Sequence, residues 1–127
     1  MRLTALPFAA FLLLLGAPPS TAADASYVAC DNGLRCVVPP CPSTTVRNLG
    51  TGQESRGIHP DIDGLAESDR QRIRETDALY FGRLVLRGHV EDREQTILGK
   101  RRSLPTLVVT GIEREATAAE RRHCPPG

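Results

Sequence analysis

The chain carries three of its four cysteines in one stretch, Cys30-Asp31-Asn32-Gly33-Leu34-Arg35-Cys36-Val37-Val38-Pro39-Pro40-Cys41-Pro42. The fourth, Cys124, lies near the other end of the chain. Four cysteines in a small exported chain are typical of two disulfides, and three pairings are open. The spacing favours Cys36–Cys41, across a short loop stiffened by prolines, together with Cys30–Cys124. The second bond would tie the start of the domain to its end.

The residues before this stretch have the pattern of a cleaved secretion signal. One positive charge precedes an apolar run over residues 5–15, and small residues follow. The run is about half the roughly 20 residues that a membrane-spanning helix needs, so we expect no retained span. The sequence therefore predicts a signal peptide over residues 1–23 and a single domain over 24–127. Cleavage after Ala23 or after Ala25 fits equally well, and the product would be secreted or periplasmic.

The composition limits the domain and its partners. About a hundred residues remain after the signal, which is enough for one domain. Only Tyr27, Tyr80 and Phe81 are aromatic in this part, so the predicted core is aliphatic. Acids and bases nearly balance, which argues against binding to nucleic acid or to an anionic membrane. Arg greatly outnumbers Lys, which suggests a bacterial genome rich in G and C, and we expect a monomer.

The clearest strand pattern places apolar Leu84, Leu86 and Val90 on one face. The other face carries Arg83, Arg87 and His89, together with Val85. The expected elements are strands at 26–30, 43–49, 82–90 and 106–112, and helices at 66–79 and 113–122. We expect Asp63 or Ser68 to cap the first helix and 99–102 to form a turn. This order predicts a small α+β fold, mostly an antiparallel β-sheet or OB-like barrel with one or two short helices, stapled by disulfides. Gly88 and Gly111 would permit sharp coiling of the sheet.

Several short motifs together carry a resemblance to a known family. They are Cys36-x-x-Pro39-x-Cys41, the strand with Val46 and Asn48, and the segments 61–65, 82–88 and 107–109. On these motifs the chain resembles the bacterial secreted domains catalogued as domain of unknown function 6748. It differs in having Pro42-Ser43 where the family has a glycine pair, and in lacking additional cysteines. The resemblance implies export and a domain type, and no activity.

One polar cluster raises the possibility of a metal site. His59, Asp61 and Asp63 bring an imidazole and two carboxylates together in the sequence. A metal needs three or four converging ligands, and the simpler interpretation is a polar loop whose last carboxylate caps a helix. A zinc site built from the cysteines and His123 does not match the spacing of paired zinc knuckles. The absence of Cys-x-x-Cys also argues against a thioredoxin-like redox centre. We therefore expect no cofactor.

The remaining residues do not form a catalytic pattern. No serine has the context of a nucleophile elbow, and His89 lies in a strand where a solvent-facing imidazole is common. The sequence thus predicts a non-enzymatic binding module whose partner is an unidentified protein or cell-envelope component. The candidate binding residues are Pro39, Pro40 and Pro42 in the disulfide-clamped loop. A secreted protease inhibitor that uses this loop is the first alternative, and a metal-binding domain is the second.

Overall fold

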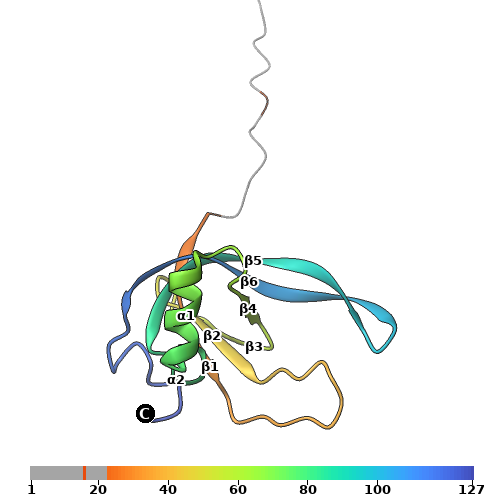
Figure 1. Cartoon of the computed structure of the whole chain (residues 1–127), viewed down its shortest axis with the longest axis horizontal. Coiled ribbons are helices and arrows are strands. Elements are labelled where there is room, and N and C mark those ends of the chain that lie inside the picture. Colours follow the sequence, from red (N-terminus) through yellow and green to blue (C-terminus); the bar gives the residue numbers. More distant parts are fainter. Residues whose placement is uncertain (1–15, 17–22) are drawn as a thin grey trace, which may run out of the picture.

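The computed structural model describes Gly16 and residues 23–127 (Figure 1). The predicted signal peptide therefore lies almost wholly outside the described residues and stays a prediction. The elements, in chain order, are β1 (Ala25–Asp31), β2 (Thr44–Asn48), β3 (Glu54–Arg56), β4 (His59–Asp61), α1 (Glu67–Glu75), α2 (Ala78–Phe81), β5 (Leu84–Ile97) and β6 (Lys100–Glu115).

The strands form one sheet that curls into a barrel. Their order is β3-β2-β1-β5-β6-β4, and every neighbouring pair is antiparallel except β4 and β6. β3 and β4 stand at opposite ends of this order, yet only Gly57 and Ile58 separate them in the chain. Because two residues join the two ends, the sheet must close on itself, with β3 and β4 as halves of one broken strand. The predicted small α+β fold, mostly antiparallel and with two short helices and two disulfides, is confirmed. A three-strand meander, a helix and a closing hairpin are the order of elements in an OB-like barrel, which is one of the two arrangements that the sequence predicts.

The barrel encloses an aliphatic core. Inward-facing residues of the strands supply most of it, and α1 adds Ile73, which is 3% exposed. The other buried members are Ala29, Val46, Ile58, Leu65, Ala78, Leu84, Leu86, Leu107 and Val109. Burial of each larger aliphatic side chain stabilises the fold by about 1.5–3 kcal/mol. The predicted alternation of Leu84 and Leu86 is confirmed, since both point into this cluster.

The predicted helix over 66–79 is in fact two helices. Asp77 has φ +49°, which is the left-handed region, and this residue interrupts the helix between α1 and α2. The predicted capping is wrong, because Ala66 is the N-cap residue and no side chain caps the helix. Neither Asp63 nor Ser68 occupies that position. Acidic residues in the first turn of α1 instead complement the positive end of the helix dipole.

The predicted helix over 113–122 is wrong. β6 continues to Glu115, which pairs with Leu84 at the start of β5. The chain then turns, and Glu120 holds the turn by accepting two hydrogen bonds from the guanidinium of Arg114, at 2.7 and 2.8 Å. Pairing with β5 thus overrides a segment of good helix formers, because a strand that completes a barrel gains ladder hydrogen bonds and burial together.

The sharp coiling of the hairpin depends on Gly88. The register of β5 and β6 shifts next to this residue, and a second shift follows Val85. A Cβ atom at position 88 would lie 2.1 Å from the carbonyl oxygen of Val108. Only glycine permits this close backbone approach. By contrast, a Cβ at Gly111 would meet no atom within 4 Å.

Two disulfides tie the barrel to its loops. Cys30 pairs with Cys124, with Cα atoms 5.6 Å apart, and Cys36 pairs with Cys41 at 5.5 Å. This is the pairing that the sequence favours. The first bond fastens the C-terminal tail to β1, and the second closes a small ring inside the β1–β2 connection. Covalent closure of this kind is common where a small domain has a limited core.

Candidate functional site

The β1–β2 connection, residues 32–43, is here called the clamped loop. Its base is held by Asn32, whose side-chain amide donates to the carbonyl of Pro42 at 2.8 Å and whose backbone N–H donates to Ser43 at 2.9 Å. The disulfide between Cys36 and Cys41 holds the tip. Because both base and tip are fixed, the loop has little freedom left to lose when it binds.

The tip of the clamped loop exposes apolar side chains. Val37 is fully exposed at 101%, Val38 is 58% exposed and Leu34 is 42% exposed. Among the predicted binding residues, Pro39 and Pro42 are exposed and Pro40 is half-buried. The prolines therefore support the loop, and the two valines present the larger apolar contact. Sequence reasoning missed the valines, because a Val-Val pair is equally typical of a buried strand.

His59 fastens the clamped loop to the barrel. Its Nε2 lies 3.0 Å from the carbonyl oxygen of Cys41, and its Nδ1 lies 3.4 Å from the hydroxyl of Thr44. A carbonyl only accepts, so the ring proton is assigned to Nε2 and Nδ1 accepts from the hydroxyl. Nearby, a Cβ at Gly57 would lie 3.1 Å from the ring of Pro42. The predicted metal ligand is thus used to position a loop.

The two candidate carboxylates point to other partners. Asp61 pairs with Arg93 from β5, and its other oxygen accepts the backbone N–H of Asp63 at 2.9 Å. The side chain of Asp63 is exposed. The structure does not bring His59, Asp61 and Asp63 together as a ligand set. Their strand does line a pocket of about 430 Å³ between β4 and the hairpin.

The β5–β6 hairpin extends far beyond the barrel, and we call residues 91–105 the arm. Its turn lies at Leu98 and Gly99, which have φ +51° and +76°, and not over the predicted 99–102. The exposed fraction of Leu98 is 72%. Figure 1 shows the arm and the clamped loop projecting from the same side of the barrel, with β3 and β4 between them. These segments, which are separated by about fifty residues in the chain, are the two projections that we consider as a candidate binding surface.

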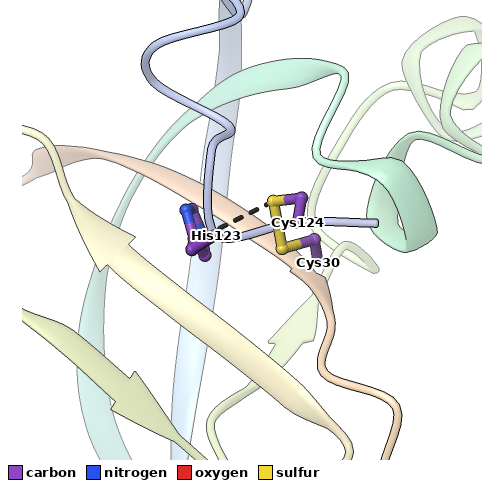
Figure 2. A group of neighbouring side chains, drawn as sticks. All are labelled: Cys30, His123 and Cys124. Atoms are coloured by element: carbon purple, nitrogen blue, oxygen red, sulfur yellow. Dashed lines mark hydrogen bonds between the residues drawn. A yellow bond between two sulfur atoms is a disulfide. The ribbon is translucent and has the colours of Figure 1, made fainter. Parts of the chain in front are cut away.

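The other cluster of potential ligands surrounds a disulfide. Among the described residues, Cys30, His123 and Cys124 are the one group of three whose ligand atoms lie close together. Figure 2 shows the imidazole beside the bonded sulfurs, with Nε2 3.5 Å from the Sγ of Cys124. Because both cysteines are oxidised, neither offers the thiolate that zinc prefers. Burial lowers the pKa of His123, which favours the neutral ring. The cluster therefore anchors the C-terminal tail.

The comparisons with known proteins are negative. No protein-family model, no curated protein and no solved structure matches this chain. The resemblance to domain of unknown function 6748 therefore stays a prediction. Neither described helix is long and apolar enough to cross a membrane. The two disulfides fit an extracellular or otherwise oxidising compartment.

Proposed function

We propose that this protein is an exported, monomeric, non-catalytic binding module that recognises a protein or cell-envelope partner through the clamped loop. One observation carries the proposal. Val37 and Val38 are 101% and 58% exposed at the tip of a loop whose base and tip are both fastened. Exposed apolar residues on a rigid support are a common basis of recognition, because their burial is favourable and little order has to be gained.

The attachments of the clamped loop support this use. The hydrogen bond from His59 to the carbonyl of Cys41, the disulfide and the bonds of Asn32 all restrain the loop without covering its tip. The disulfide also stabilises the fold, and it leaves Val37 and Val38 uncovered at the tip. The structure lends the metal-binding alternative no comparable support.

A peptide selection tests the proposal. A library of random 12-residue peptides is displayed on phage and selected against the purified protein with both disulfides intact. We expect selected peptides to bind a Val37→Ala, Val38→Ala variant more weakly. Loss of two methyl groups at each site removes about 1.5 kcal/mol of apolar contact, or roughly tenfold in Kd per valine. Thr51→Ala removes an exposed side chain of similar size at the opposite end of β2 and should leave Kd unchanged.

A stability control and two possible outcomes decide whether the proposal stands. Both valines are solvent-exposed, so the variant should keep the wild-type urea midpoint, which shows that any weaker binding is local. If no peptide is enriched, or if every selected peptide ignores the two valines, the clamped loop is not a binding surface and the proposal is wrong.

The second candidate is a protease inhibitor that uses the same loop. The full exposure of Val37 beside a disulfide favours it, because inhibitor loops present one side chain outward from a rigid support. An aliphatic residue of this size suits an elastase-like pocket. A panel of purified serine proteases should then include at least one that is inhibited at micromolar protein, with loss of inhibition in Val37→Asp. Absence of inhibition across the panel rejects this candidate and leaves the first intact.

A further inference from the structure

The arm has a free strand edge on the side of β4. β4 pairs with β6 only from Thr106 to Val108. Toward the tip, residues 100–105 pair with β5 on one side, and no described strand pairs with them on the other. Pro105 has no N–H, and the other unpaired backbone N–H and C=O groups along this edge are a template for an added strand. A two-stranded ribbon is also marginally stable alone, so an added strand would strengthen the arm.

The charges on the arm determine which kind of strand could pair with this edge. Arg93 and Arg101 are neutralised within the protein, by Glu91 with Asp61 and by Glu94 respectively. Lys100 and Arg102, in contrast, take part in none of the ion pairs of the described chain. They stand two positions apart on β6, so their side chains share one face of the ribbon. The free edge therefore carries two uncompensated positive charges.

These charges argue against a second copy of this chain as the occupant. A twofold pairing of two β6 edges would bring Lys100 and Arg102 of each copy close to those of the other, and like charges across a strand pair are destabilising. An acidic strand has the opposite effect, because each of its carboxylates would meet a free cation. Charge complementarity thus favours a partner segment with net negative charge.

The position of the edge also connects it to the clamped loop. β4 pairs with β6, and His59, the first residue of β4, bonds to Cys41 of the clamped loop. A strand added to residues 100–105 would lie in line with β4, on the same side of β6, and would extend beyond His59 toward the tip of the arm. It would therefore enter beside the clamped loop, and Figure 1 shows both projections on that side of the barrel.

We propose, building on the function above, that the partner contributes an extended acidic segment that adds as a strand to residues 100–105. Its backbone would bond to the free edge of β6, its carboxylates would face Lys100 and Arg102, and an apolar residue would contact Val37 and Val38. Strand addition of this kind takes affinity from main-chain hydrogen bonds and specificity from alternating side chains.

The peptides selected above provide the probe, and their sequences are the first result. We expect a net negative charge and no proline in the central residues. A Lys100→Glu, Arg102→Glu variant should bind them about tenfold or more weakly, because two attractions become repulsions at exposed sites. The matched reversals Arg72→Glu and Arg122→Glu, which lie away from the arm, should leave Kd unchanged. If the first variant fails to fold, Lys100→Ala with Arg102→Ala replaces it, with a smaller expected loss.

A second measurement isolates the added strand from simple charge attraction. Peptides with N-methyl groups on alternate residues keep every side chain but lose half of their main-chain donors. Two such peptides are compared, one methylated at the odd residues and one at the even residues. We expect one of them to lose binding and the other to keep it, because only the N–H groups of alternate residues point toward the neighbouring strand. Amide hydrogen exchange of residues 100–104 should also slow when the unmodified peptide is bound.

The outcomes separate this inference from the proposed function. Selected peptides that depend on Val37 and Val38, yet ignore both the charge reversal and N-methylation, overturn the added strand and leave the clamped loop as the binding site. Enrichment of basic peptides likewise overturns it. A selection in which no peptide depends on the two valines overturns the proposed function and this inference together.

Discussion

Removal of the Cys30–Cys124 disulfide measures how strongly the closure of the chain stabilises the barrel. The bond joins residues 94 positions apart, whereas Cys36 and Cys41 are 5 apart. The loss of entropy in the unfolded chain grows with the logarithm of loop length, so the long loop contributes about 4.7 kcal/mol and the short one about 2 kcal/mol. Cys30→Ala with Cys124→Ala should therefore lower the free energy of unfolding by about 4.7 kcal/mol. Alanine is chosen because Cys30 is fully buried and a hydroxyl there would need a partner.

The assay is equilibrium unfolding in urea, followed by far-ultraviolet circular dichroism at pH 7. The matched control is Cys36→Ala with Cys41→Ala, which removes the same atoms from the shorter loop. A domain of about a hundred residues has a free energy of unfolding of roughly 5–15 kcal/mol. The long-loop variant should thus unfold at a much lower urea concentration, or be partly unfolded without urea, while the short-loop variant keeps most of its stability.

Two results would refute this reasoning. Equal urea midpoints for the two variants would show that loop length does not set the contribution of each bond. A short-loop variant less stable than the long-loop variant would show that the restraint of the clamped loop matters more to the fold than the attachment of the C-terminal tail.

The remaining predictions concern the hairpin and the tail. Gly88→Ala should lower the free energy of unfolding by about 1–3 kcal/mol, because the new Cβ would lie 2.1 Å from the carbonyl oxygen of Val108; Gly111→Ala, which meets no atom within 4 Å, is the control, and equal urea midpoints would contradict the close approach. Arg114 and the backbone N–H of Thr117 lower the pKa of Glu120 from 4.5 to about 2. The ionised Glu120, paired with Arg114, therefore stabilises the fold above pH 4.5, and this contribution is lost as the pH falls toward 2. Glu120→Gln should make the melting temperature less dependent on pH across that range, and an unchanged pH profile would disprove the effect.

Local patterns in the chain were sufficient for much of the architecture. The alternation at Leu84 and Leu86 reports one buried strand face directly, because side chains in a strand alternate with period two. The turn-rich stretches and the aliphatic composition then leave few ways to build a small α+β domain. The cysteine spacing favours the observed pairing for the same reason, since a bond across a short loop needs only local geometry.

Element ends were harder to predict, because contacts distant in sequence decide them. Residues 113–115 are good helix formers and yet belong to β6, since Arg114 and Glu115 pair with the start of β5. The hairpin turn falls at Leu98 and Gly99 because the register set in the barrel continues to the tip of the arm. Asp77 interrupts the predicted helix, which lets α2 pack against β1.

The candidate site shows the same division between local and distant information. The sequence by itself determined that the stretch from Cys36 to Pro42 is a stiff loop, because prolines and a short disulfide restrict the backbone wherever they occur. Only the tertiary structure decided that His59 bonds to this loop, and that the arm projects from the same side of the barrel. A hydrogen bond between residues 18 positions apart, and a shared side of a barrel, depend on how the sheet closes. No local pattern encodes that closure, because it is the sum of strand pairings along the whole domain.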